Sequence, residues 1–403
     1  PVAGNIGIGH TRWATHGAPS DTNAHPHFSN DDKIAVVHNG IIENYQELKK
    51  ELEAKGYAFH SETDTETVAH LIDDYYKQGN DLLEAVRKTL ERIEGSYALG
   101  VLCTDYPDQL IAARKESPLI VGLGKGENFI ASDIPAILNY TKDAYILGDK
   151  ELALVKADSV KLYDIEGNEI EREVYTYKWD VEAAQKNGYD HFMLKEIFEQ
   201  PKVVKDNLAK RFSEDGKSIE LDGIKLGKAE LENINQIYIV ACGTAYYAGL
   251  IGKYLLERIV RIPVNSDVAS EFRYKDPLID EHTLVIVISQ SGETADTHSA
   301  LKLAKAKGAR VLGIVNAVGS SIARDADDVL YTLAGFEIAV ASTKAFSAQV
   351  VAMYLITLHI AQELGKIDDK TFAEIKCAMD KLPSQINDIL TKALPAIRKF
   401  VNK

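Results

Sequence analysis

The chain has 403 residues and a formal net charge of −14, with 46 basic and 60 acidic side chains. Because such a charge repels polyanions, nucleic acid and anionic membrane surfaces are poor candidate partners. The length exceeds what one ordinary core holds, so we expect at least two domains in a chain of normal globular composition.

The first part of the chain, to about residue 163, mixes short strands with two helical patterns. An apolar strand is predicted at 34–38, and it runs into Asn39–Gly40, a turn dipeptide. Helices are predicted at 44–55 and 65–76. Further strands are predicted at 96–104, 109–114, 119–123, 128–132, 144–147, 151–156 and 159–163. This mixture predicts an α+β domain with stacked sheets.

From 171 to about 235 the sequence is polar and helical, and we expect a linker that packs on the next domain. Strands are predicted after it at 237–241, 283–289, 310–315 and 329–332, with a further candidate at 263–268. Helices are predicted at 245–260, 296–307, 320–325 and 344–364, followed by a polar helical tail. Continuous apolar strands alternating with helices predict an α/β fold with a doubly wound parallel sheet.

A predicted strand-to-helix junction at 289–294, Ser-Gln-Ser-Gly-Glu-Thr, has the composition of an anion site. Helix starts at the carboxyl ends of parallel strands offer unpaired N–H groups and the positive end of a dipole. The loop lacks the lysine of a nucleotide P-loop, so we expect a phosphomonoester bound without a metal. Ordinary helix capping explains one such loop equally well. A second loop of this design, Gly243–Thr244, favours the ligand.

This loop, together with Ala-Cys-Gly-Thr at 241–244 and Glu-Ile-Ala-Val-Ala-Ser-Thr-Lys at 337–344, resembles the sugar isomerase (SIS) domain family. The resemblance implies a site for a sugar phosphate. Its expected binding residues are Gly243, Thr244, Ser289, Gln290, Ser291, Thr294, Val340 and Ser342. Ala245 departs from the family pattern, in which serine is common, and removes one hydroxyl donor.

The segment 9–17, Gly-His-Thr-Arg-Trp-Ala-Thr-His-Gly, is dense in side chains that bind or polarise ligands. The forked guanidinium of Arg12 suits an α-carboxylate, and Asp64 could hold an α-ammonium. Asn39 and Gly40 supply a side-chain amide and a flexible backbone N–H, the parts of an oxyanion hole. Taken alone, Asn39–Gly40 is better explained as a hairpin turn, Arg12 as half of a surface ion pair and Trp13 as core.

In order along the chain, segments 10–17, 23–27, 38–44 and 61–66 resemble the class II glutamine amidotransferases. The resemblance implies an N-terminal-nucleophile fold with an αββα sandwich. It implies that Arg12, Thr15, His16 and Asp64 bind glutamine, that Trp13 gates ammonia passage, and that Asn39 and Gly40 form the oxyanion hole. The spacing of the histidines does not support a metal site, so we expect neither metal nor cofactor.

The nucleophile of that family is an N-terminal cysteine whose own α-amine acts as base. Pro1 cannot take this role, and the chain opens without Met, as if cut from a longer protein. Cys103 is expected to be buried packing and Cys242 to be structural. We therefore expect that the chain as printed does not hydrolyse glutamine.

The two halves in this order resemble the glucosamine-6-phosphate synthases, a family of glutamine-dependent fructose-6-phosphate aminotransferases. The resemblance implies an amidotransferase domain at 1–170, a linker at 171–230, a first SIS domain at 231–366 and a helical connector at 367–403. It also implies L-glutamine and fructose 6-phosphate as substrates and a homodimer formed through SIS domains. In that family the isomerase base, the ring-opening histidine and a sugar-linking lysine lie in a second SIS domain and tail, beyond residue 403.

Cysteine usage and the apolar pattern bear on the compartment. Three widely spaced cysteines, Cys103, Cys242 and Cys377, predict no disulfide framework and indicate a reducing compartment, which we take to be the cytoplasm. We expect no signal peptide, since none is visible at the start of the printed sequence, and the longest apolar runs, such as 283–289, are strand-sized and far short of a membrane span.

Three alternatives stay open. Another class II amidotransferase would share the first half but needs a pyrophosphate or nucleotide loop in the second. A regulator that senses sugar phosphates would share the SIS domain but should carry a basic helix-turn-helix. The third alternative is a ligand-binding fragment without catalysis.

Overall fold

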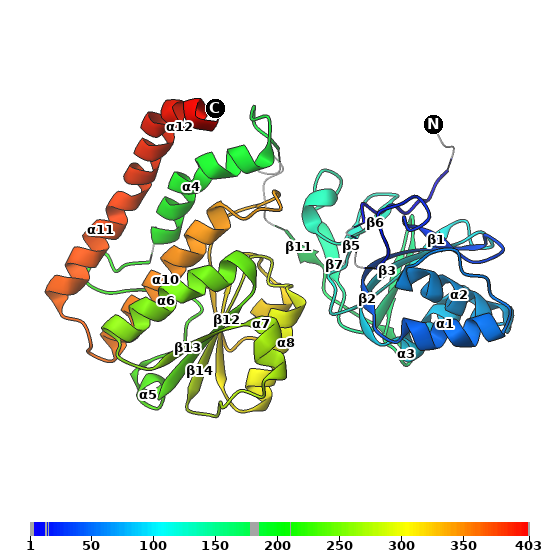
Figure 1. The fold of residues 1–403 in the computed structure, drawn as a ribbon, viewed down its shortest axis with the longest axis horizontal. Coiled ribbons are helices and arrows are strands. Elements are labelled where there is room, and N and C mark those ends of the chain that lie inside the picture. Colours follow the sequence, from blue (N-terminus) through cyan, green and yellow to red (C-terminus); the bar gives the residue numbers. More distant parts are fainter. Residues whose placement is uncertain (1–3, 13, 15, 178–184, 210, 402–403) are drawn as a thin grey trace. The chain divides into compact units, whose positions relative to one another are not determined.

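The computed structural model describes residues 4–12, 14, 16–177, 185–209 and 211–401. The chain divides into two compact units, Pro1–Val181 and Glu182–Lys403, each with its own hydrophobic core (Figure 1). The first unit is built on antiparallel sheets, and the second is built on a parallel sheet.

The first unit contains a seven-stranded sheet and a four-stranded sheet. The larger has the order β1 (His27–Phe28), β2 (Ile34–Ile42), β3 (Gly95–Cys103), β4 (Gln109–Lys115), β8 (Glu151–Lys156), β9 (Val160–Tyr163) and β10 (Glu169–Ile170). The smaller has the order β11 (Tyr175–Thr176), β7 (Asp143–Ile146), β5 (Ile120–Leu123) and β6 (Asn128–Ala131). The helical elements are α1 (Tyr45–Ala54), α2 (Asp64–Lys77), α3 (Leu82–Arg92) and the 3-10 turn η1 (Ile134–Ala136).

Side chains of the larger sheet alternate between its two faces, as a pleated strand requires. In β3, Leu99 and Val101 join the core formed with α1, α2 and α3. Ala98, the residue before Leu99, faces the opposite side and joins a second core with Val121 of β5 and Leu147. The described part of this unit therefore stacks helices on the larger sheet and the smaller sheet on its other face.

Asn39 and Gly40 do not form the expected hairpin turn. They lie inside β2, where they pair with Ala98 and Tyr97 of β3. Gly40 has a φ of 129°, and a Cβ there would lie 2.1 Å from the carbonyl oxygen of Ser96. Long-range strand pairing thus overrides the local turn preference, and the glycine serves a close backbone approach.

The first unit also has one helix more than the two predicted. Helix α3 begins after Asp81, whose side chain accepts a hydrogen bond from the N–H of Glu84. Its buried residues Leu82, Val86 and Leu90 follow the spacing of a helix face. Both signals are visible in the sequence, and the prediction overlooked them.

The second unit is built on five parallel strands in the order β13 (Val264–Val268), β12 (Gln236–Ala241), β14 (Thr283–Ser289), β15 (Arg310–Val315) and β16 (Asp328–Tyr331). Its helices are α4 (Phe192–Leu208), α5 (Lys228–Glu232), α6 (Gly243–Ile259), α7 (Ala269–Tyr274), α8 (Ala295–Ala306), α9 (Ser321–Asp325), α10 (Lys344–Glu363), α11 (Asp369–Asp388) and α12 (Leu394–Val401), with the π-helical turn η3 (Ile389–Ala393) before α12. The predicted parallel sheet is confirmed, while α7 was not predicted.

Helices cover both faces of this sheet. Helices α6 and α10 pack on one face, around Ile239 and Ile286. Helices α7, α8 and α9 pack on the other, around Val240 and Val287. Because Ser289 pairs with Val315 and Val315 with Tyr331, the strands end at one edge, and the loops that follow β12, β14, β15 and β16 share that edge.

Helix α10 is 20 residues long and apolar enough to cross a membrane by length and composition, contrary to the expectation that apolar runs are only strand-sized. Within the unit, 67% of its apolar window is buried. Met353 and Ile356 pack in the core beside the sheet, so α10 serves as a core helix here.

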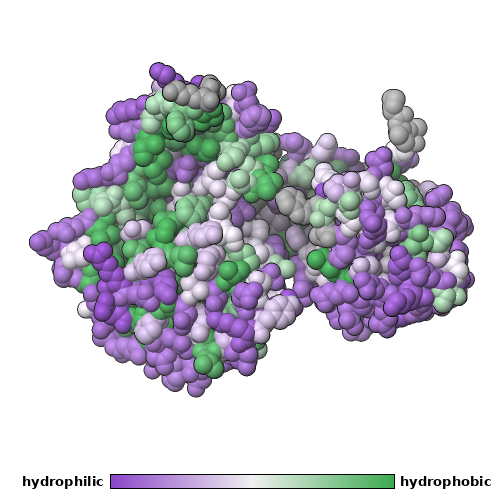
Figure 2. All heavy atoms as spheres, viewed as in Figure 1, coloured by the Kyte–Doolittle hydropathy of each residue, from purple (hydrophilic) through white to green (hydrophobic). Residues whose placement is uncertain are grey.

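The outer side of α10 packs with α4 and α11 around Val204, Leu355 and Phe372. Figure 2 shows apolar side chains gathered toward the C-terminal end of this unit, where Ile397 and Phe400 of α12 are exposed.

Candidate functional site

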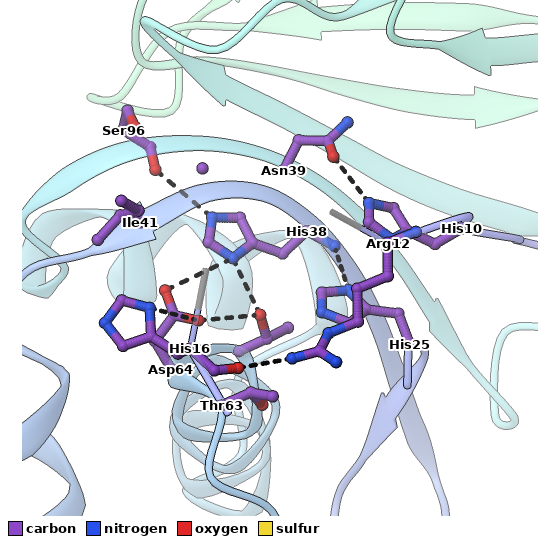
Figure 3. A pocket seen from close by; sticks show the side chains of 12 residues that line it. His10, Arg12, His16, His25, His38, Asn39, Ile41, Thr63, Asp64 and Ser96 are labelled. Atoms are coloured by element: carbon purple, nitrogen blue, oxygen red, sulfur yellow. Dashed lines mark hydrogen bonds and ion pairs between the residues drawn. The ribbon is translucent and has the colours of Figure 1, made fainter. Parts of the chain in front are cut away.

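A cavity of about 240 Å³ opens in the first unit where β2, β3, the start of α2 and the N-terminal segment meet (Figure 3). It is lined by His10, Arg12, His16, His25, His38, Asn39, Gly40, Ile41, Thr63, Asp64, Thr65 and Ser96. The structure therefore brings Arg12, His16, Asp64 and the Asn39–Gly40 pair, predicted from separate segments, around one space.

The Arg12 guanidinium is held by the chain that follows it. It donates hydrogen bonds to the carbonyl oxygens of His16 at 2.6 Å, Gly17 at 3.0 Å and Ala18 at 3.2 Å. A guanidinium has five N–H donors, so donors remain for a ligand carboxylate. The backbone of Arg12 has a φ of 50°, a conformation that costs a non-glycine residue free energy and is found at functional sites.

Asp64 is the first residue of α2 and is only 3% exposed. Its Oδ2 accepts a hydrogen bond from the backbone N–H of Ile42 at 2.8 Å. Its Oδ1 lies 4.0 Å from His16 Nδ1, a buried atom that finds no hydrogen-bond partner among the described residues. A ligand donor placed between the two side chains would hydrogen-bond to Asp64 Oδ1.

Three further histidines, for which no role was predicted, also line this cavity: His10, His25 and His38. Burial, followed by the neighbouring rings of His10, His27 and His38, lowers the pKa of His25 to about 3. Burial lowers the pKa of His38 as well, against the pull of Asp64. Neutral His25 accepts a hydrogen bond at Nδ1 from the backbone N–H of His38 at 3.2 Å.

The ring of His38 ties together the two elements that frame the cavity. Its Nδ1 lies 3.0 Å from Thr65 Oγ1, and its Nε2 lies 3.4 Å from the carbonyl oxygen of Ser96. With the proton on Nε2, the ring donates to Ser96 and accepts from Thr65. Ser96 is 58 residues from His38 along the chain, which explains why sequence spacing did not reveal it.

Two predicted glutamine-site residues, Trp13 and Thr15, lie outside the described residues. None of the residues lining the cavity is a cysteine. Cys103 ends β3 and is 4% exposed, and burial raises the pKa of its thiol. A raised pKa leaves less thiolate, the reactive form, as the packing role predicted for Cys103 requires. Among the described residues, no group of three or more His, Cys, Asp or Glu is placed to hold a metal ion.

The predicted sugar-phosphate loop runs from the end of β14 to the start of α8. Ser289 Oγ accepts a hydrogen bond from the N–H of Gly292 at 2.9 Å and lies 2.9 Å from Thr294 Oγ1. Ser291 Oγ accepts from the N–H of Glu293 at 3.1 Å. Two of the loop's N–H groups are therefore already bonded within the loop, and Ser291 is exposed at its tip.

The helix ends beside this loop keep their N-terminal donors available. Thr294 precedes α8 and Cys242 precedes α6, and neither makes a side-chain capping hydrogen bond. Gly292 has a φ of 67°, and a Cβ there would lie 2.0 Å from Ser320 Oγ. Gly243 opens α6 with a φ of 57°, and Thr244 beside it is exposed.

The loop before α10 carries the other two predicted sugar contacts. Val340 is 87% exposed, and Ser342 Oγ donates to Glu337 at 3.1 Å. Glu337 also accepts from the backbone N–H groups of Thr343 and Ala345, which caps the start of α10. The contacts of Val340 and Ser342 do not join them to the loop of Ser289.

Helix α4, expected to belong to a linker that packs on the second domain, holds this loop, a role that was not predicted. Glu196 is 2% exposed and accepts from the N–H groups of Ile338 at 2.6 Å and Ala339 at 3.1 Å. Glu199 accepts from Lys344 Nζ at 2.6 Å. Glu196 and Glu199 are three residues apart and therefore lie on one helix face. This spacing is the signal in the sequence that could have indicated their role.

Comparison with known proteins agrees with the two-part architecture. A family model described as a glutamine amidotransferase domain matches residues 10–139, and one described as a SIS domain matches residues 230–359. The structure resembles the C-terminal domain of glucosamine-fructose-6-phosphate aminotransferase from Francisella tularensis, with a TM-score of 0.51 and 38% identity over 54% of this chain and 60% of that one.

Curated relatives match over nearly the whole chain. A glutamine–fructose-6-phosphate aminotransferase (isomerizing) of Clostridium tetani is 60% identical over 96% of this chain and 64% of its own length. One from Caldanaerobacter subterraneus is 59% identical over 100% of this chain and 66% of its own length. The chain thus spans slightly less than two thirds of these relatives. Over nearly its whole length, the chain is therefore similar to the glutamine–fructose-6-phosphate aminotransferases.

Proposed function

We propose that the protein takes part in transferring the amide nitrogen of glutamine to fructose 6-phosphate, with ketose-to-aldose isomerisation to glucosamine 6-phosphate. The observation that carries the proposal is the meeting of Arg12, Asp64 and the Asn39–Gly40 pair around one cavity. The printed names of relatives at 60% and 59% identity support the same reaction.

In the proposed complex the cavity binds both charged groups of the glutamine zwitterion. The free donors of Arg12 bind the α-carboxylate, because a guanidinium fork matches a carboxylate. The buried Asp64 carboxylate binds the α-ammonium, and Thr15 and His16 contribute further contacts. The amide end then points at Asn39 and Gly40, whose N–H groups would stabilise negative charge developing on the carbonyl oxygen, and Trp13 gates the ammonia.

In the second unit, the proposed sugar-phosphate site lies at the edge where the parallel strands end. The N-termini of α6 and α8 offer backbone donors and a favourable dipole to a phosphate. The residues proposed to hold the sugar phosphate are Gly243, Thr244, Ser289, Gln290, Ser291, Thr294, Val340 and Ser342. Since Gly292 and Glu293 donate within the loop, phosphate would bind the hydroxyls of Ser291 and Thr294 and the helix-start amides.

The proposal includes the finer fold assignment. The first unit would be an N-terminal-nucleophile αββα sandwich, of which the described residues supply a helical layer and both sheets. The second would be a doubly wound SIS domain, since helices cover both faces of its parallel sheet. We further propose a cytoplasmic homodimer that pairs through SIS domains.

Calorimetry on the purified chain tests the two binding sites separately. We expect one glutamine and one fructose 6-phosphate to bind per chain, with fructose and glutamate as weaker control ligands. Formation of glucosamine 6-phosphate is then measured with the full-length gene product. Absence of this product, together with absence of glutamine and sugar-phosphate binding, would overturn the proposal.

A further inference from the structure

The side-chain amide of Asn39 has a neighbour that determines which way it faces. Its Oδ1 lies 2.7 Å from His10 Nε2, and the rings and amide are drawn in Figure 3. An amide reversed by 180° would place its NH₂ group against the same ring nitrogen. The orientation therefore depends on whether His10 Nε2 carries a proton.

A backbone hydrogen bond determines where the proton of the His10 ring lies. The N–H of Arg12 donates to His10 Nδ1 at 3.0 Å. A backbone amide is always a donor, so Nδ1 must supply a lone pair, and the proton of the neutral ring then sits on Nε2. Arg12 has a positive φ at the point where its backbone N–H turns back to the side chain of His10, two residues earlier.

With Nε2 donating, only the oxygen of the Asn39 amide can face His10. Both N–H donors of Asn39 Nδ2 are then unused by His10, no described residue accepts from them, and Asn39 lines the cavity. The His10 ring itself is held in place by stacking on His25, with centroids 4.5 Å apart and planes inclined by 18°. His25 is in turn held by the backbone N–H of His38.

We propose that His10 is a positioning residue that fixes its own Nε2–H tautomer through Arg12 and thereby aims the amide donors of Asn39 at the reacting carbonyl. Through its two hydrogen bonds, His10 connects Arg12, which is proposed to bind the carboxylate, to Asn39, which is proposed to stabilise the oxyanion. This inference rests on the proposed glutamine site, since a positioned donor matters only if a carbonyl is there to receive it.

The tautomer is tested first, on the purified chain, by long-range ¹H–¹⁵N correlation of the histidine rings, with His10 assigned from His10→Phe. We expect an unprotonated Nδ1 and a protonated Nε2 for His10. A protonated Nδ1 in the neutral ring would overturn the inference, whatever the activity.

Turnover is tested next, as glutamate release from glutamine by the full-length gene product. Removing one oxyanion donor lowers kcat by about 10²–10³ fold, so Asn39→Asp, which replaces the donor by an acceptor of the same shape, should show that loss. His10→Phe keeps the stacking on His25 but removes the hydrogen bond, and we expect kcat to fall at least tenfold with little change in KM for glutamine. His10→Gln, whose amide N–H can reach Asn39, should recover part of the loss.

The results of these measurements distinguish the oxyanion role of Asn39 from the positioning role of His10. If Asn39→Asp keeps wild-type turnover, the oxyanion role in the proposed function fails. If Asn39→Asp is impaired while His10→Phe turns over normally, the positioning role alone fails. Thermal unfolding of each variant shows whether a loss reflects misfolding, and a correctly folded His10→Phe with unaltered kcat contradicts the inference.

Discussion

The backbone N–H of Ile42 donates a hydrogen bond of 2.8 Å to the carboxylate of Asp64. The contact ties the last residue of β2 to the first residue of α2, so the carboxylate is held two residues along the strand from Gly40. The bond uses Oδ2 and leaves Oδ1 facing His16. The same interaction that joins strand and helix therefore orients the negative charge proposed to bind an ammonium group.

Asp64→Asn should weaken glutamine binding more than it weakens the fold. The asparagine oxygen can still accept from Ile42, but the charge opposite the ammonium is lost. Hydrogen bonds to charged groups contribute about 1.5–3 kcal/mol, so we expect affinity to fall by roughly ten- to a hundredfold in calorimetry. Asp21→Asn, which removes the same charge from an exposed position, should bind as the wild type does. Equal affinity of the two variants would refute the role of Asp64.

Gly40→Ala should destabilise the first unit by backbone strain and by a clash. Its φ is 129°, and the new Cβ would lie 2.1 Å from the carbonyl oxygen of Ser96. Gly56 is a matched control, since its φ is 94° and a Cβ there meets nothing within 4 Å. We expect Gly56→Ala to cost about 1 kcal/mol and Gly40→Ala at least about 2 kcal/mol more in urea unfolding. A similar loss for both would show that β2 relaxes around the methyl group.

Glu66 should make unfolding depend on pH in the acid range. Burial raises the pKa of this carboxyl group, but hydrogen bonds from His70, His60 and Ser61 outweigh it and lower the pKa to about 2 from 4.5. Because the folded pKa is depressed, the stabilisation is complete above pH about 4.5 and is lost as pH falls toward about 2. At about 1.4 kcal/mol per pKa unit, the loss is about 3.5 kcal/mol.

Guanidinium unfolding of the chain at a series of pH values measures this dependence. We expect Glu66→Gln to flatten the curve between about pH 4.5 and 2, while Glu47→Gln, an exposed glutamate on α1, should leave it unchanged. The interpretation would be abandoned if the Glu66→Gln curve ran parallel to that of the wild type.

Thr294→Val and Ser291→Ala should each weaken binding of fructose 6-phosphate. Both remove a hydroxyl donor from the proposed phosphate loop, and we expect about a tenfold loss for each, as one lost hydrogen bond to a charged group implies. Ser384→Ala on α11, whose hydroxyl donates to the carbonyl oxygen of Lys381, is the control. Because the lost contact is to phosphate, the weak binding of fructose should not change. If a variant lost affinity for fructose and for fructose 6-phosphate to the same extent, its hydroxyl would not be a phosphate contact.

Glu196→Ala should loosen the loop that carries Val340 and Ser342. Its buried carboxylate accepts from the N–H groups of Ile338 and Ala339, and an unsatisfied buried donor costs about 1–3 kcal/mol. We expect lower thermal stability and weaker fructose 6-phosphate binding. Glu196→Gln keeps an acceptor of the same shape and should retain most of both. Identical behaviour of the Ala and Gln variants would indicate that charge, and not the acceptor, holds the loop.

Much of the second unit could be predicted because its strands are buried on both faces. The predicted strands at 283–289 and 310–315 coincide with β14 and β15, since a continuous apolar run ends sharply where the chain leaves the core. The turn that local preference favoured at Asn39–Gly40 was wrong for the opposite reason. A turn preference is local, and the pairing with Ala98 and Tyr97 that overrides it joins residues far apart in the chain.

The sequence by itself determined the chemical groups of the two candidate sites, because side-chain type and the order of short segments are written directly in it. Only the tertiary structure decided how those groups are oriented. The bond from His10 to Asn39 spans 29 residues, and that from Glu196 to Ile338 spans 142. Such contacts follow from strand pairing and helix packing across the whole unit, and no local pattern encodes which oxygen meets which N–H.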